Sequence, residues 1–137
     1  MKVVLVEPGK MARITEIDSS LQSMQKLVGG LIQAVYPWQD AAALVCSDEG
    51  KLLGLPLNRA LQQDGQIYDA VVGTFFVCGI REEDFCSLTP QQTEKYLREF
   101  REPEMFMQTP DGIAVAKCSE EQYRDFMKSK ERREMER

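Results

Sequence analysis

Histidine is absent from the 137 residues of the chain. Its absence removes the side chain that most often acts as a general base and most often ligates metal ions. The sequence also lacks a G-x-x-x-x-G-K phosphate loop, a G-x-G-x-x-G dinucleotide motif and a G-x-S-x-G nucleophile elbow. We therefore expect no catalytic residues, and we expect that the protein is not an enzyme.

Paired cysteines are absent as well, because Cys46, Cys78, Cys86 and Cys118 lie far apart and none forms a C-x-x-C motif. This spacing lacks the paired ligands of structural zinc sites, although a four-cysteine site remains an alternative. Without an export signal, disulfides are not expected. We predict reduced thiols, no metal and no cofactor.

Long apolar runs are also missing. No stretch approaches the roughly 20 apolar residues of a membrane span, and the apolar N-terminal run ends at Pro8, too soon for a secretory signal. The sequence therefore predicts no membrane partner and a cytoplasmic location. With 43% hydrophobic and 28% charged residues, the composition is that of a globular chain rather than a disordered one.

Positive charge is scarce outside the C-terminus. The net charge is −5, yet residues 128–137 hold five of the 17 basic residues and only three of the 22 acidic ones. An acidic body argues against direct, sequence-specific binding of nucleic acid, which depends on clustered Lys and Arg. It is compatible with binding a basic protein surface. The interleaved glutamates of the tail favour a solvated, salt-bridged helix.

The hydrophobic pattern predicts an α+β fold. We expect a single domain over residues 1–118, a mainly antiparallel sheet of hairpins packed by two helices, and a charged C-terminal helix or extension over residues 119–137. Helices are predicted to begin at Ser19, Thr89 and Ser119, because each precedes a Gln by three residues, as in a capping box. The predicted strands are residues 2–6, 12–17, 31–36, 42–46, 51–53, 67–80, 105–108 and 113–117.

Two stretches between these elements need separate interpretation. Residues 57–62 are predicted as a helical turn or a surface-crossing loop, because Pro56 removes a backbone donor, and residues 81–84 as an acidic loop. Residues 71–80 are almost continuously apolar, which indicates a central strand covered on both faces. Gly73 within that run suggests a bulge or a close backbone approach.

The most unusual local feature is the polar pair Asn58-Arg59 between Leu57 and Ala60. A charge in an apolar setting is costly unless it has partners. In the structural interpretation, which we favour, Asn58 caps a turn and Arg59 binds an acid such as Asp48 or Asp69.

In the functional interpretation, the pair recognises a ligand or a partner, with Tyr68 and Thr74 as neighbours. Tyr36, Trp38 and Phe106 are either exposed interface anchors or, more commonly, packing residues. A carboxylate dyad drawn from the acids near the pair is a further alternative. The candidate recognition residues are Asn58, Arg59, Asp48, Tyr68 and Trp38, and the acids near them are Asp48, Glu49, Asp64 and Asp69.

Several separated motifs occur in a characteristic order. They are V-E-P-G-K at residues 6–10, L-V-G-G-L-I at 27–32, V-C-S-D-E-G-K-L at 45–52, G-L-P-L-N-R-A-L at 54–61, I-Y-D at 67–69 and V-G-T-F-F-V at 72–77. Together they resemble an uncharacterised family catalogued as domain of unknown function 3846, over roughly residues 1–118. The resemblance implies no catalytic residues. It implies a setting in phages, plasmids and conjugative elements, often beside genes that blunt host defence.

This setting leads to the first functional hypothesis. We expect a non-enzymatic accessory protein of a phage or mobile element that binds and inhibits a host defence protein, such as a CRISPR or restriction nuclease, in the bacterial cytoplasm. One alternative is a protein that sequesters a nucleotide signal, with Arg59 contacting phosphate. Another is a structural homodimer.

Overall fold

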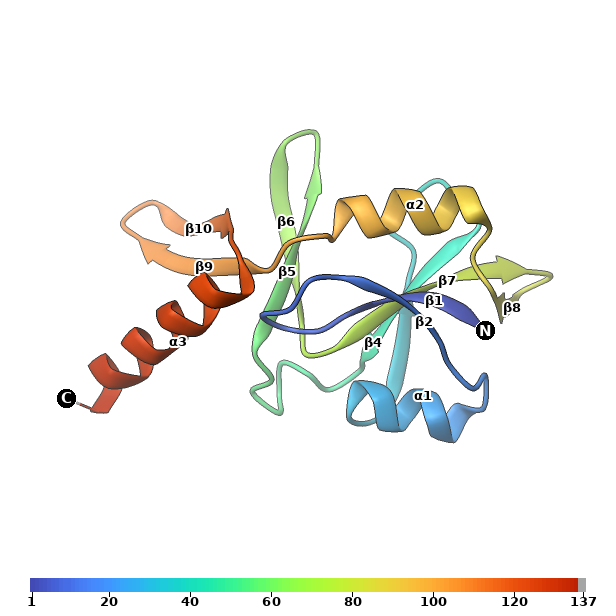
Figure 1. Cartoon of the computed structure of the whole chain (residues 1–137), viewed down its shortest axis with the longest axis horizontal. Coiled ribbons are helices and arrows are strands. Elements are labelled where there is room, and N and C mark those ends of the chain that lie inside the picture. The colour runs from blue at the N-terminus through green and yellow to red at the C-terminus, as the bar shows by residue number, and fades with distance from the viewer. Residues whose placement is uncertain (136–137) are drawn as a thin grey trace.

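A six-stranded antiparallel sheet forms the centre of the protein (Figure 1). The structure is a computed structural model that describes residues 1–135. The strand order in the main sheet is β2-β1-β7-β4-β3, with β8 paired to β7, and two hairpins, β5–β6 and β9–β10, form separate two-stranded sheets. The strands are β1 (Lys2–Val6), β2 (Arg13–Glu16), β3 (Ile32–Val35), β4 (Ala42–Ser47), β5 (Leu57–Gln63), β6 (Gln66–Val72), β7 (Phe75–Arg81), β8 (Asp84–Cys86), β9 (Glu104–Thr109) and β10 (Gly112–Lys117).

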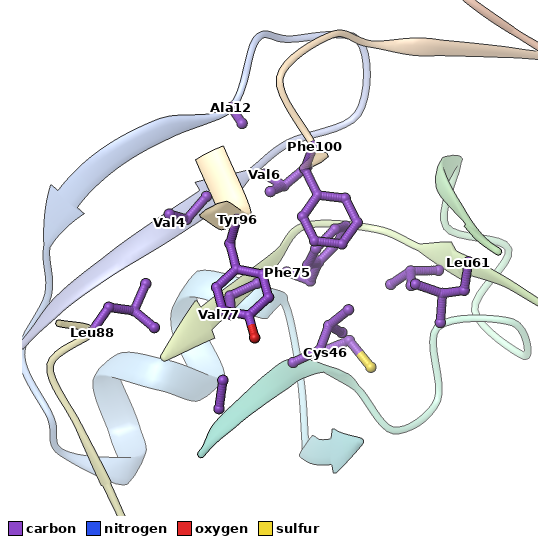
Figure 2. Packing of buried hydrophobic residues seen from close by; sticks show 13 residues of the cluster. Val4, Val6, Ala12, Cys46, Leu61, Phe75, Val77, Leu88, Tyr96 and Phe100 are labelled. Carbon is purple, nitrogen blue, oxygen red and sulfur yellow. The ribbon is translucent and has the colours of Figure 1, made fainter. Parts of the chain in front are cut away.

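Helices α1 (Leu21–Val28) and α2 (Pro90–Glu99) cover opposite faces of the main sheet (Figure 1). Met24 and Val28 of α1 are buried against one face. Tyr96 of α2 and Phe100, the residue that ends it, are buried against the other face, where Figure 2 shows both rings directed toward the sheet. The expected α+β fold with an antiparallel sheet of hairpins is confirmed.

Strand β7 is the central strand that its apolar sequence predicts. Phe75 and Val77 belong to the cluster beneath α2, whereas Phe76 and Cys78 belong to the cluster beneath α1. The predicted run from residue 67 to residue 80 is nevertheless two strands. The chain turns at Gly73, whose φ is +74°, and a Cβ there would lie 2.7 Å from Leu55 Cδ1. The close approach expected at Gly73 is therefore confirmed.

The predicted helix starts are right at two of three positions. At α2, Thr89 and Gln92 form a complete capping box. At α3 (Glu120–Met135), Ser119 and Gln122 exchange the same pair of hydrogen bonds. For α1 the cap is Ser20 rather than Ser19, because the Ser20 side chain accepts the Ser23 N–H.

Two other predictions were wrong, and a third missed a strand. Residues 51–53 are a turn, in which Leu53 N–H donates to Glu49 O at 2.9 Å. Residues 57–62 are not a helical turn or loop but lie in strand β5, because the two-residue turn Asp64-Gly65, with positive φ at both positions, returns the chain as β6. The acidic loop predicted at residues 81–84 is present as a tight turn at Glu82 and Glu83, but the short strand β8 that follows it was not predicted.

The β9–β10 hairpin and α3 extend from the main sheet on one side (Figure 1). The strands predicted at residues 105–108 and 113–117 are present and pair as this hairpin. Tyr123, Phe126 and Met127 of α3 are each half-buried, so the helix has one loosely covered face. The division of the chain after residue 118 stays a prediction. Within residues 1–135, no helix combines the length and apolar character required to cross a membrane.

Candidate functional site: the Asn58–Arg59 junction

Asn58 and Arg59 both lie inside the protein, although neighbours in a regular strand would face opposite sides. Leu57 pairs with Val72 and Arg59 with Val71, so Asn58 is the extra residue of a β-bulge in β5. The bulge interrupts the alternation of the strand, and both side chains are 0% exposed. The sequence singled out the right pair, but only the bulge explains why both members are buried.

Arg59 directs all of its N–H donors at oxygen atoms inside the protein. Nε and Nη2 donate to Phe100 O at 3.2 and 3.1 Å, and Nη2 also donates to Lys10 O at 2.7 Å. Nη1 donates to Asn58 O at 3.3 Å and to Asn58 Oδ1 at 2.9 Å. A guanidinium has five N–H groups, and these five hydrogen bonds employ them all.

Asn58 adds two further connections. Its Nδ2 donates to Val6 O at 3.0 Å and to Gly73 O at 2.8 Å. Through the two side chains, β5 is therefore joined to the end of β1, to the β1–β2 turn at Lys10, to the link before β7 and to the end of α2. The junction connects segments that lie between 15 and 52 residues away in the sequence.

A buried carboxylate accompanies the junction. Glu104 Oε1 accepts the Ala60 N–H at 2.8 Å. Burial raises the pKa of Glu104, while the Ala60 N–H and the charge of Arg59 oppose that rise. Burial also lowers the pKa of Arg59 to about 10, and the attraction of Glu104 limits the fall. Arg59 therefore remains a cation at neutral pH.

The prediction that Arg59 binds an acid such as Asp48 or Asp69 was wrong. Carbonyl oxygens hold Arg59, whereas Asp69 binds Lys51 with 3.0 Å between its Oδ1 and Lys51 Nζ, and Asp48 is exposed. Burial raises the pKa of Asp69, but the hydrogen bonds from Lys51 and the Ala70 N–H keep it below the usual value. A phosphate could reach the guanidinium of Arg59 only by replacing its bonds to carbonyls.

Asp48 lines a small cavity of about 190 Å³ between the end of β4 and the β5–β6 hairpin. Cys46, Lys51 and Asp69 also line it. Ligand pockets commonly measure about 300–1,000 Å³, so the space suits only a small polar group. Burial raises the pKa of the Cys46 thiol, and the nearby charges of Asp48 and Asp69 act in the same direction, which opposes use of this cysteine as a nucleophile.

Trp38 belongs to the packing beneath α2 rather than to the junction. Its ring centroid lies 4.4 Å from that of Tyr96 and 6.1 Å from that of Phe100, and its Nε1 donates to Glu99 Oε1 at 3.3 Å. Trp38 is only partly exposed, as is Phe106, whereas Tyr36 and Tyr68 are exposed. Thr74, the other neighbour expected for the pair, is half-buried beside Gly73.

Two polar residues that the sequence analysis did not single out also make hydrogen bonds inside the protein. Glu104 is one, and the other is Asp40, whose Oδ2 accepts the Tyr96 hydroxyl at 2.5 Å. That hydrogen bond lowers the pKa of Asp40 against the opposing effect of burial. In a chain with 22 acidic residues, an isolated Asp or Glu carries no local signal of such a role.

The four cysteines are free thiols, and only Cys86 is partly exposed. Among the residues that the structure describes, no group of three or more Cys, Asp or Glu side chains has an arrangement that could hold a metal ion. Burial raises the pKa of the Cys78 thiol to about 12. This environment is typical of cysteines that serve as small core residues.

Comparison with known proteins identifies the family. The family model described as Domain of unknown function (DUF3846) matches residues 1–101, and the chain therefore belongs to that family. No curated protein and no solved structure matches the chain. The matched residues include both members of the junction and the Phe100 carbonyl that Arg59 binds, and they end before β9–β10 and α3.

Proposed function

We propose that this family member is a non-enzymatic accessory protein of a phage or other mobile element. In this proposal it binds and inhibits a host defence protein, a CRISPR or restriction nuclease, in the cytoplasm of the bacterial host. The mobile-element setting comes from the resemblance of its motifs. The choice of a binding protein rests on how the chain distributes its polar and apolar side chains.

The observation that carries the proposal is a set of exposed apolar residues that neighbour Lys51 and Asp69, the members of an ion pair, in the sequence. Leu52, next to Lys51, is 90% exposed, and Tyr68, next to Asp69, is also exposed. Leu53 and Ile67 are exposed as well. Apolar and aromatic side chains on a surface are the usual anchors of protein–protein contacts.

The charge of the chain supports a basic partner surface. The chain carries −5 overall, and residues 128–137 hold five of its 17 basic residues but only three of its 22 acidic ones, so the rest of the chain is more acidic than the total suggests. Nuclease surfaces that bind DNA are basic, because they must neutralise phosphates. An acidic protein with exposed apolar anchors can compete for such a surface through charge and apolar contact together.

A paired assay tests the proposal. The tagged protein is added to representative restriction and CRISPR effectors, and nuclease activity and co-purification are both measured. We expect inhibition of at least one effector, with loss of both signals in the Leu52→Glu/Tyr68→Glu variant. Leu21→Glu, which changes an exposed leucine of α1, is the matched control and should inhibit like the wild type. Failure of the wild type to bind or inhibit any effector would refute the proposal.

The alternative, sequestration of a nucleotide signal, has a separate readout. Since the N–H groups of Arg59 are engaged, such a ligand would require another cation. Lys51 beside the Asp48 cavity is the candidate, and it would have to exchange its ion pair with Asp69 for the phosphate. A thermal shift with cyclic or ADP-ribose-type nucleotides, in the absence of any nuclease inhibition, would favour this alternative over the inhibitor proposal.

A further inference from the structure

The two edges of the main sheet differ in chemistry. One edge is β2, which carries Arg13 and Glu16, and charged residues of this kind keep an edge strand from pairing with other chains. The other edge is β3, whose sequence Ile32-Gln33-Ala34-Val35 has no charge. The exposed apolar residues Leu31 and Tyr36 flank β3 at its two ends. The edge at β3 therefore lacks the charged residues that protect the edge at β2.

The hydrogen bonds to β4 determine which backbone groups of β3 face outward. Asp48 N–H donates to Leu31 O at 2.8 Å, immediately before the ladder in which Ile32 pairs with Ser47. Hydrogen-bonded and non-bonded pairs alternate in an antiparallel ladder, so Gln33 and Val35 also direct their backbone groups toward β4. The N–H and C=O groups of Ile32, Ala34 and Tyr36 consequently point away from the sheet.

The same alternation places the side chains. Ile32 and Ala34 pack against the cluster beneath α1, whereas Val35 packs against the cluster beneath α2. Tyr36 follows Ala34 by two residues and is therefore expected on the α1 side, where it is 64% exposed. The outer edge of β3 thus offers three outward backbone positions with an aliphatic side chain at one end and an uncovered aromatic ring at the other.

We propose that β3 pairs with β3 of a second copy of this chain, antiparallel across a two-fold axis. The register that uses all three outward positions sets Ala34 opposite Ala34 of the other copy and Ile32 opposite Tyr36. An aromatic residue opposite a β-branched one is a favourable cross-strand pair, and no like charges meet in this register. The sequence of β3 is in this sense complementary to itself.

Two further observations favour a second copy of the chain as the partner of β3. A two-fold contact buries the same edge on both chains and closes the assembly, and the charged edge at β2 opposes further growth. The contact is small, because β3 has four residues, so the dimer is expected to be weak and concentration-dependent. Since each copy carries −5, added salt should strengthen it.

Sedimentation velocity over a range of protein concentrations tests this pairing. Ala34→Pro removes an outward N–H without removing a bond to β4, and Tyr36→Lys places like charges at the contact. Ile113→Lys is the matched control, because Ile113 of β10 is also 64% exposed. We expect the wild type and the control to dimerise alike and each of the other two variants to dimerise at least tenfold more weakly.

Each possible result either supports or contradicts the proposed dimer. Circular dichroism establishes that each variant is folded, and if Ala34→Pro is not, Tyr36→Lys alone decides. A wild type that stays monomeric at every concentration would overturn the inference, as would variants that dimerise like the wild type. Amides of β3 that become protected from exchange only when a different protein binds would assign the edge to that partner and would also overturn the dimer.

Discussion

Arg59 closes the carboxyl end of α2 by donating two hydrogen bonds to Phe100 O, from Nε at 3.2 Å and from Nη2 at 3.1 Å. Helix ends leave carbonyl groups without partners, and a cation there also interacts favourably with the helix dipole. Because Arg59 also binds Lys10 O, the same side chain fixes the β1–β2 turn. One residue of β5 thereby sets the position of α2 against the main sheet.

Replacement of Asn58 by Leu is expected to lower the free energy of unfolding by about 2–4 kcal/mol. Leucine has a similar volume but removes the donor to Val6 O and Gly73 O and one of the two acceptors of Arg59 Nη1. Urea denaturation measures the change. Gln62→Leu, an exposed change in the same strand, is the control and should remain within about 0.5 kcal/mol of the wild type. Equal effects of the two substitutions would contradict a role for Asn58 in holding these segments.

Two substitutions of Glu104 distinguish the contribution of its acceptor oxygen from that of its charge. Glu104→Ala leaves the Ala60 N–H unpaired and should cost about 1–3 kcal/mol. Glu104→Gln keeps an acceptor and should remain within about 1 kcal/mol of the wild type at neutral pH. The reason is that the pKa of Glu104 is raised in the folded chain, so its ionisation opposes folding as the pH increases. Denaturation that shows Gln and Ala to be equally harmful would refute this account.

The sequence predicted most elements of the main sheet and all three helices, because they follow apolar periodicity and local caps. It missed strand β5, where the effect of Pro56 was extended to residues that do pair with β6. It found Asn58 and Arg59 but assigned Arg59 a carboxylate partner. Apart from Asn58 Oδ1, the actual acceptors are backbone carbonyls, which every residue has, so no side-chain pattern could identify Lys10 and Phe100.

Because Tyr96 donates a hydrogen bond to Asp40, we predict that this contact contributes to the stability of the protein in a pH-dependent way. The Tyr96 hydroxyl holds the pKa of folded Asp40 below its value of 3.8 in the unfolded chain. The resulting stabilisation is present above pH 3.8 and is lost as the pH falls through the lowered pKa. Tyr96→Phe should therefore be less stable than the wild type at neutral pH, and the difference should shrink in acid. Unfolding measured across this range, with a difference that does not change, would contradict the assignment.

Gly9 and Tyr123 predict a coupling between the β1–β2 turn and α3. Gly9 has a φ of +77°, and a Cβ there would overlap the Tyr123 ring. Gly9→Ala should destabilise the protein through both backbone strain and this overlap. In a Tyr123→Ala background only the strain remains, so the cost of Gly9→Ala should be smaller. A double-mutant cycle measures the difference, and additive costs would show that the two residues do not contact each other.

The central claim is that Arg59 holds the fold together rather than contacting a ligand. Its most direct test is the free energy of unfolding of Arg59→Lys, with the exposed Arg81→Lys as control. Lysine keeps the charge but cannot donate to Phe100, Lys10 and Asn58 at once. We predict a loss of about 2–4 kcal/mol for Arg59→Lys and no measurable change for Arg81→Lys. Unaltered unfolding of Arg59→Lys, together with loss of partner or ligand binding, would contradict the claim.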